Sequence, residues 1–178
     1  MMALSFLKCR VQAPLAAAPS LPVRRARPGE GTALAAIRRA AILDGRGTDL
    51  TPECRRAWAD TADAHAGPEA FEAWIIDPNH LLLVPAGDVP LAYVHADLPL
   101  GHLRALFVRP AAAGQGLATG LLAQALSYGS SLGVRHWRVD ASPRAEAIYR
   151  RAGFRPERRT VTQLRDGFLL PTVTMRRP

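Results

Sequence analysis

The sequence contains little cysteine, few aromatic residues and a single lysine. Its 178 residues include two cysteines, Cys9 and Cys54, which cannot build a disulfide framework and by themselves supply too few ligands for a four-ligand zinc site. Two reduced thiols are typical of a reducing compartment, so we expect a cytoplasmic protein. No stretch approaches the roughly 20 consecutive apolar residues of a membrane-spanning helix, and we therefore expect no membrane partner.

The length and the apolar content indicate one folded domain. A chain of 178 residues, 48% of them hydrophobic, has the size of an ordinary domain and leaves little chain for a second one. The same apolar content excludes a wholly disordered chain. The first 21 residues contain no acidic residue, two prolines and an alanine-rich patch. We expect residues 1–21 to be a poorly ordered tail and residues 22–178 to form the domain.

Positive charge is the unusual feature of the composition. Lysine and arginine number 23, aspartate and glutamate number 15, and the net charge is +8. Such a balance favours a polyanionic partner: nucleic acid, an anionic membrane surface or a phosphate-rich cofactor. Aromatic residues make up only 6% and the arginines are scattered, which is not typical of a nucleic-acid-binding domain. A bias of the source proteome toward arginine and alanine explains the charge equally well, and we do not favour nucleic acid.

Hydrophobic periodicity divides the chain after the tail into short strands and helices. Strands are predicted at 22–26, 81–84, 91–96, 101–108, 134–141, 160–164 and 169–175. Helices are predicted at 30–43, 51–58, 68–74 and 114–132, and a last one opens at Ser142-Pro143 and closes at Gly153. This order predicts an α+β fold built around one mixed sheet.

The segment from Leu106 to Leu122 is the most informative part of the sequence. A predicted strand ends at Pro110 and a predicted helix begins within a few residues, with glycine at positions 114 and 116. The first amides of a helix are unpaired and carry partial positive charge, and glycine lets an anion approach the main chain. The junction is therefore a candidate phosphate site, although glycines in such a loop also serve turn geometry alone.

Two motifs in this half of the chain resemble those of the GNAT N-acetyltransferase superfamily. Residues 108–122 read V-x-P-x-x-x-G-x-G-x-A-x-x-L-L, which resembles the family's coenzyme A pyrophosphate loop. Residues 139–154 are similar to its strand–helix segment ending A-x-x-Φ-Y-x-x-x-G-F, where Φ is apolar, in the branch with Ala141-Ser142 at the start. The resemblance covers residues 22–175 and implies a single GNAT-like α+β domain, with helices flanking a mixed, mostly antiparallel sheet.

The resemblance also implies an activity and a set of site residues. It implies transfer of an acetyl group from acetyl-CoA to a primary amine of a small molecule or peptide, by direct attack and without a covalent intermediate. The strand before the loop would contact the pantetheine arm and offer a donor to the thioester oxygen, and the loop amides would hold the pyrophosphate. The residues implied in cofactor binding are Leu106, Phe107, Val108, Ala113, Gly114, Gln115, Gly116, Leu117, Ala118, Thr119 and Ser142.

Tyr149 occupies the motif position that implies a general acid. The departing thiolate of coenzyme A needs a proton, and a thiol pKa near roughly 8.5 lies below the tyrosine value of about 10. A phenol that reaches the sulfur can therefore supply this proton at modest thermodynamic cost. Without the motif, a tyrosine in such a helix would be interpreted as a packing residue.

Two departures from the family pattern leave alternatives open. Ala113 stands where the family usually has arginine or glutamine, so a phosphate contact is missing that Gln115 or an arginine could replace. The glutamate base that relatives often carry on the strand before the loop is also absent. These departures suit a non-catalytic acyl-CoA-binding or regulatory module, and the charge alone suits a nucleic-acid-binding domain. The remaining candidates for the base are His95, His102, Asp97 and Glu72.

The acceptor amine is not identified by any sequence pattern. Trp58 and Trp74 lie in the early helical region, which shapes acceptor pockets in similar proteins, although core packing is the usual role of tryptophan. The oligomeric state is equally open, and a homodimer is compatible with the sequence.

Overall fold

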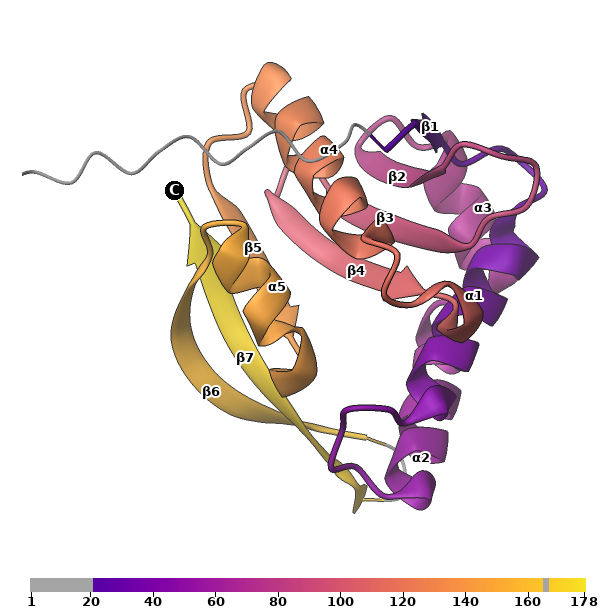
Figure 1. Ribbon diagram of the computed structural model, residues 1–178, viewed down its shortest axis with the longest axis vertical. Helices are drawn as coiled ribbons and strands as arrows, with labels where there is room; N and C mark the ends of the chain where they lie inside the picture. Colours follow the sequence, from indigo (N-terminus) through magenta and orange to yellow (C-terminus); the bar gives the residue numbers. More distant parts are fainter. Residues whose placement is uncertain (1–20, 165–166) are drawn as a thin grey trace, which may run out of the picture.

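The computed structural model describes residues 21–164 and 167–178 (Figure 1). The predicted tail lies outside these residues except for Leu21, which packs against the main hydrophobic cluster, and Cys9 lies outside them as well. The strands are β1 (Val23–Arg25), β2 (His80–Pro85), β3 (Ala92–Asp97), β4 (His102–Val108), β5 (Trp137–Ala141), β6 (Arg155–Gln163) and β7 (Leu169–Arg177). The helices are α1 (Gly31–Asp44), α2 (Pro52–His65), α3 (Pro68–Ile76), α4 (Leu117–Ser131) and α5 (Glu146–Arg151), with 3₁₀ turns η1 (Pro110–Ala112) and η2 (Pro143–Ala145).

The strands form one sheet in the order β1-β2-β3-β4-β5-β7-β6. Every neighbouring pair is antiparallel except β4 and β5, which are parallel and share only the pairs His102–Arg138 and Leu103–Val139. Beyond Leu103 the two strands separate, as Figure 1 shows. The predicted α+β class and the mixed, mostly antiparallel sheet are confirmed, and the sheet is split in the middle.

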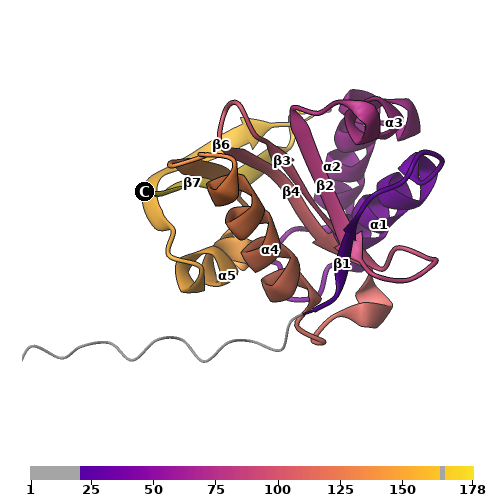
Figure 2. The same cartoon turned by 90° about the horizontal axis from the view of Figure 1, so that it is seen from above.

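Helices cover both faces of the sheet (Figure 2). Side chains alternate along the central strands, so Leu81 and Leu83 of β2 pack in the cluster under α4, whereas Leu82 and Val84 pack in the cluster with α1 and α3. Strands buried on both faces read as continuous apolar runs, which is why the sequence reveals β2 and β3 so clearly. Within the described residues, no helix has both the length and the apolar character that crossing a membrane requires.

Several predicted boundaries are wrong, each for a physical reason. The second helix continues past Trp58 to His65, because its last turns are held by ion pairs of Asp63 with arginines of α1 and not by an apolar stripe. Strand β6 begins at Arg155 instead of residue 160, and its exposed, arginine-rich residues carry no alternating pattern. Helix α4 begins only at Leu117, because Gly116 takes a left-handed conformation.

Candidate functional site

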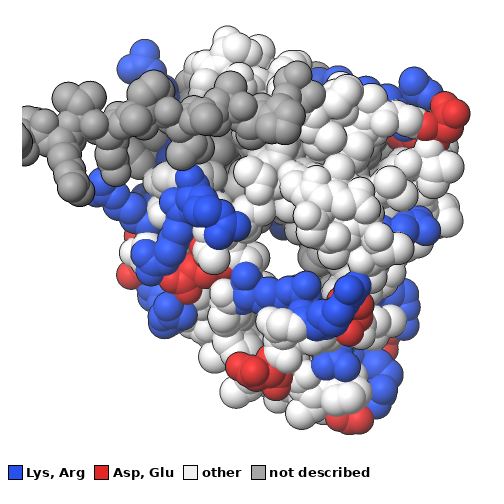
Figure 3. Space-filling model, in the orientation of Figure 1, with Lys and Arg blue, Asp and Glu red and all other residues white. Residues whose placement is uncertain are grey.

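Two cavities meet where β4 and β5 separate. The first, of about 420 Å³, is called the β3 cavity because Tyr93 and His95 of β3 line it. The second, of about 660 Å³, is called the α4 cavity because Ala113 and Ala118 at the start of α4 line it. In Figure 3 the surface is hollowed between α5 and the β4–α4 connection of Figure 1. The residues that line both cavities are Trp58, Leu106, Phe107, Ser142, Ala145, Tyr149 and Leu170.

The start of α4 offers a row of unpaired main-chain amides. Gly114 and Gly116 have φ angles of 81° and 76°, and a Cβ at either position would meet no atom within 4 Å, so the chain turns sharply beside open space. Among the described residues, no group accepts a hydrogen bond from the amides of residues 114–119. These amides and the positive end of the helix dipole are suited to bind an anion such as a diphosphate.

The split leaves one edge of β4 unpaired near this loop. Leu106, Phe107 and Val108 pair with β3, but on the β5 side they have no strand partner. Unpaired main-chain groups at such an edge can hydrogen-bond an extended ligand in the way that a neighbouring strand would. The edge runs from the β3 cavity into the α4 cavity, since Leu106 and Phe107 line both.

The predicted site residues converge, but not all of them through their side chains. Gly114, Gln115, Gly116, Leu117 and Thr119 line neither cavity, but the unpaired amides of this segment lie in the chain between Ala113 and Ala118, which line the α4 cavity. The predicted residues that line at least one cavity are Leu106, Phe107, Val108, Ala113, Ala118, Ser142 and Tyr149.

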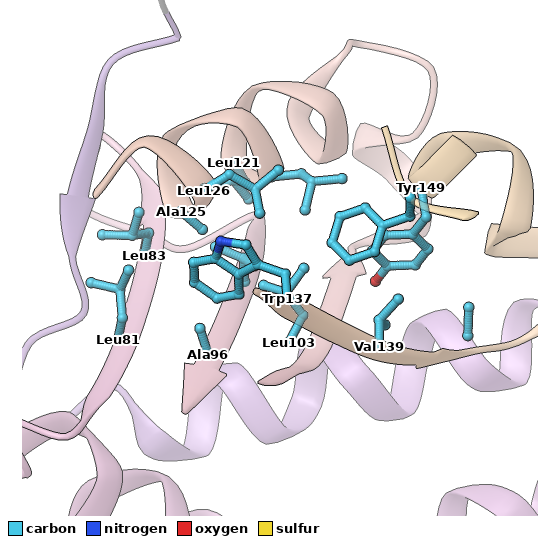
Figure 4. Close-up of a cluster of buried hydrophobic side chains, with 14 of the residues drawn as sticks. Leu81, Leu83, Ala96, Leu103, Leu121, Ala125, Leu126, Trp137, Val139 and Tyr149 are labelled. Atoms are coloured by element: carbon cyan, nitrogen blue, oxygen red, sulfur yellow. The ribbon is translucent and has the colours of Figure 1, made fainter. Parts of the chain in front are cut away.

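Tyr149 stands between the two cavities. It comes from α5, is 4% exposed, and packs edge-on against Phe154 at 5.6 Å between ring centroids. Figure 4 shows it beside the cluster that includes Leu103 and Val139, so the packing interpretation is correct as far as the ring is concerned. Its hydroxyl has no hydrogen-bond partner among the described residues, and burial raises the pKa of Tyr149 above its usual value. A neutral phenol with a proton to give therefore lies at the junction.

The α4 cavity contains residues that no sequence motif indicated. The α1–α2 connection contributes Thr48, Asp49 and Leu50, which the fold brings beside the loop from a distant part of the chain. Arg144 of η2 also lines this cavity, and it makes no hydrogen bond or ion pair with another described residue. Because Ala113 supplies no polar group, Arg144 is the arginine best placed to contact a phosphate there.

The four candidates for a base are separated by their surroundings. Glu72 accepts hydrogen bonds from the amides of Gly29 and Gly31 at 2.9 and 2.6 Å, and so is occupied at the start of α1. Asp97 is paired with Arg104 at 2.8 Å. His102 lies 3.5 Å from Asp140 and lines neither cavity. Of the four candidates, only His95 lines either of the two cavities.

His95 is a buried, uncharged imidazole. It is 2% exposed, its Nε2 lies 2.9 Å from Nδ1 of His80, and its ring lies 4.6 Å from the ring of Trp74. Burial, reinforced by the charge that His80 can carry, lowers the pKa of His95 to about 3. At neutral pH it is therefore an uncharged ring in the wall of the β3 cavity, with its Nε2 hydrogen-bonded to His80.

We expect His95 to make the fold sensitive to acid. The unfolded chain takes up a proton here below about pH 6.5, whereas the native chain does so only near pH 3, so stability is lost as the pH falls between these values. As the pH falls below about 6.5, the free energy of unfolding should decrease less in the His95→Gln variant than in the wild type, with a difference of up to about 1.4 kcal/mol per pH unit. Urea unfolding at pH 7, 6 and 5 measures this difference. Equal pH dependence in both proteins would contradict the role of His95 in the acid sensitivity. The matched control is His65→Gln, because His65 is exposed.

Comparison with known families fits this geometry. A model described as an acetyltransferase (GNAT) domain matches residues 48–177, which is more than half of the chain. The chain belongs to the GNAT acetyltransferase family. The predicted resemblance is confirmed, and the protein falls among the acyltransferases. No curated protein matches the sequence.

Solved structures share the fold over most of their length. A GCN5-related N-acetyltransferase from Rhodopseudomonas palustris is 25% identical, with 89% of this chain and 96% of that chain covered and a TM-score of 0.76. The PaiA N-acetyltransferase of Thermoplasma acidophilum, solved with coenzyme A, is 14% identical over 87% and 96% of the two chains, with a TM-score of 0.68. A phosphinothricin acetyltransferase of Sinorhizobium meliloti, solved with acetyl-CoA, is 20% identical over 90% and 89%, with a TM-score of 0.60. The last two show likeness of fold alone.

Proposed function

We propose that this GNAT protein transfers an acetyl group from acetyl-CoA to an amine by direct attack of the amine on the thioester. The observation that carries the proposal is the position of Tyr149, which lines both cavities at the split. The α4 cavity, with the unpaired amides of residues 114–119 beside it, would take the cofactor, and the β3 cavity would take the acceptor. The coenzyme A and acetyl-CoA in the two related structures support acetyl-CoA as the cosubstrate.

The residues around the α4 cavity suit the cofactor. The amides of residues 114–119 would hold the diphosphate, and Arg144 would supply the positive side chain that Ala113 lacks. The free edge of β4 at Leu106, Phe107 and Val108 would hydrogen-bond the pantetheine arm. Pantetheine laid along this edge brings the thioester to the split, where Tyr149 stands.

The chemistry at the split follows from these positions. The amine nitrogen forms a bond to the thioester carbon, and an amide of β4 would donate to the oxyanion that develops. The C–S bond then breaks, and the thiolate takes the proton of the Tyr149 hydroxyl. The acceptor amine loses one proton, which returns to the phenolate or passes to solvent. Acetyl-CoA and an amine thus give an acetamide and free coenzyme A thiol.

Binding and thiol release together test the proposed function. Acetyl-CoA at about 100 times its Kd should stabilise the protein by about 2.7 kcal/mol, which thermal unfolding detects as a raised Tm. Release of coenzyme A thiol should then appear with at least one amine of a diverse panel. Stabilisation without release from any amine would favour the non-catalytic acyl-CoA-binding module. An unchanged Tm would contradict the proposal.

The nucleic-acid alternative has little support from the surface. On the face shown in Figure 3, basic side chains are interspersed with acidic ones. Two arginines of the last two strands are paired: Arg159 of β6 with Glu146 and Arg176 of β7 with Glu157. Retention on DNA that falls steeply with salt would be needed to revive this alternative.

A further inference from the structure

The β3 cavity has walls made of aromatic rings. Phe71 lies edge-on to both Trp74 and Tyr93 at 5.4 Å between centroids, and Tyr93 lies 5.9 Å from Phe107. Trp58 continues the row at 6.5 Å from Phe107. All five rings line the cavity, three of them from α2 and α3 and two from β3 and β4. Walls of this kind favour a ligand with an apolar or aromatic skeleton.

Two residues that line this cavity each carry a buried hydrogen-bond donor that lacks an acceptor. The hydroxyl of Tyr93, a residue with no exposed surface, has no partner, and neither has Nε of Arg38, a residue 5% exposed. The other end of the Arg38 guanidinium is satisfied, since Nη2 donates to Asp63 at 2.8 Å and to the Ala66 carbonyl at 2.7 Å. Buried donors are nearly always paired, so two orphans on one cavity need an explanation.

The charges that line the cavity favour an acceptor with a negative group. Arg38 and Arg104 both line it, each held by an aspartate that does not. The carboxylate that lines it, Asp140, already accepts hydrogen bonds from Arg138 and Thr174 at 2.7 Å each. A second ammonium group on the acceptor would therefore find two guanidinium groups and no free carboxylate.

We propose that the acceptor is a small aminocarboxylate, an amino acid with an apolar or aromatic skeleton, whose carboxylate accepts hydrogen bonds from Tyr93 and Arg38. A carboxylate has only acceptor atoms, which matches two orphan donors. Its skeleton would lie against the aromatic walls, and its amine would face the split, where Tyr149 lines the same cavity. This inference rests on the proposed function, because it assigns the acceptor of that reaction.

Matched acceptors test the inference directly. Thiol release from acetyl-CoA would be measured with phenylalanine, its amide and phenethylamine, and with methionine and its decarboxylated amine. We expect kcat/KM for the amino acids to exceed that for the matched compounds about 10-fold to 100-fold, the range of one or two charge-assisted hydrogen bonds. The uncharged amide separates the effect of the carboxylate from that of the amine pKa. Spermidine represents the polyamines, which the cavity should reject.

Two variants connect the preference to the orphan donors. Tyr93→Phe removes only the hydroxyl, so it should reduce the preference for amino acids about 10-fold through KM, with a Tm equal to or above that of the wild type. Arg38→Gln should reduce the preference as well. Arg39→Gln is its matched control, because Arg39 pairs with the same Asp63 but does not line the cavity. If Arg38→Gln fails to fold, Tyr93→Phe alone decides.

The outcomes separate this inference from the proposed function. Equal turnover of acids, amides and amines, or a preference for spermidine, overturns the inference and leaves acetyl transfer intact. An amino-acid preference that Tyr93→Phe does not change overturns it too. A raised Tm with acetyl-CoA but no turnover of any compound overturns the inference and the catalytic proposal together. If acetyl-CoA does not raise the Tm, the proposed cofactor binding is wrong, and the proposed function is overturned together with this inference.

Discussion

Replacing Tyr149 by phenylalanine is expected to lower kcat about 100-fold to 10,000-fold, the usual contribution of a general acid. The substitution removes only the hydroxyl, which has no partner among the described residues, so the core around Phe154 should stay intact. The affinity for acetyl-CoA should be unchanged, because the diphosphate site lies at α4. Single-turnover thiol release measures the first effect, and calorimetric titration of acetyl-CoA measures the second.

The control for this experiment is a tyrosine of another helix. Tyr128 lies on α4, lines neither cavity, and its hydroxyl accepts a hydrogen bond from Arg25 at 3.3 Å. Tyr128→Phe should leave kcat unchanged. Because burial raises the pKa of Tyr149, the wild-type rate should show no alkaline decline from this group up to about pH 10, the ordinary tyrosine value. A Tyr149→Phe variant with nearly the wild-type rate would remove the phenol from the mechanism.

Valine at position 116 is expected to abolish detectable acetyl-CoA binding. Gly116 has a φ of 76° and borders open space beside the loop amides, so a branched side chain would strain the turn and occupy the space of the diphosphate. Losing the main-chain contacts to a doubly charged group should weaken binding at least about 100-fold, given about 1.5–3 kcal/mol for each hydrogen bond to a charged group. Titration with acetyl-CoA, at a temperature where circular dichroism shows the variant folded, measures the loss.

The opposite end of the same helix supplies the control. Gly133 follows α4, has a φ of 86°, and a Cβ there would also meet no atom within 4 Å. Gly133→Val therefore introduces a similar backbone strain, of about 1–3 kcal/mol, without touching the cofactor site. It should lower the Tm as Gly116→Val does and leave the affinity for acetyl-CoA unchanged. An equal loss of affinity in both variants would show that strain alone is responsible.

The parts of the fold that the sequence predicts are those with a strong local signal. The apolar runs of β2 and β3 and the helical spacing from Leu117 to Leu126 indicate their elements correctly. Strand β6 is missed at its start because its arginines face solvent, and pairing with β7 forms the strand there. Helix α2 is predicted too short because Asp63 is recognised as a partner only when Arg38 is known to lie beside it.

The candidate site also has one part that the sequence predicts and another that only the structure shows. The loop at residues 114–119 and Tyr149 follow from motifs, because their chemistry depends on the spacing of neighbouring residues. No motif indicates Arg144, Arg38 or Tyr93, since the roles proposed for them depend on which other elements surround them. Of the proposed bases, Glu72 and Asp97 look equivalent to His95 in the sequence, and only their partners in space distinguish them.

By itself, the sequence determined the α+β class, the GNAT family and the segment that would hold the diphosphate, because each depends on patterns of residues close together along the chain. The tertiary structure decided where β4 separates from β5, which groups line the two cavities, and which polar atoms are left unpaired. Those properties arise from contacts between distant residues: Arg38 of α1 pairs with Asp63 of α2, and Tyr93 packs against Phe71 of α3 and Phe107 of β4. Burial and desolvation, which set hydrogen-bonding capacity and pKa, exist only after those contacts have formed.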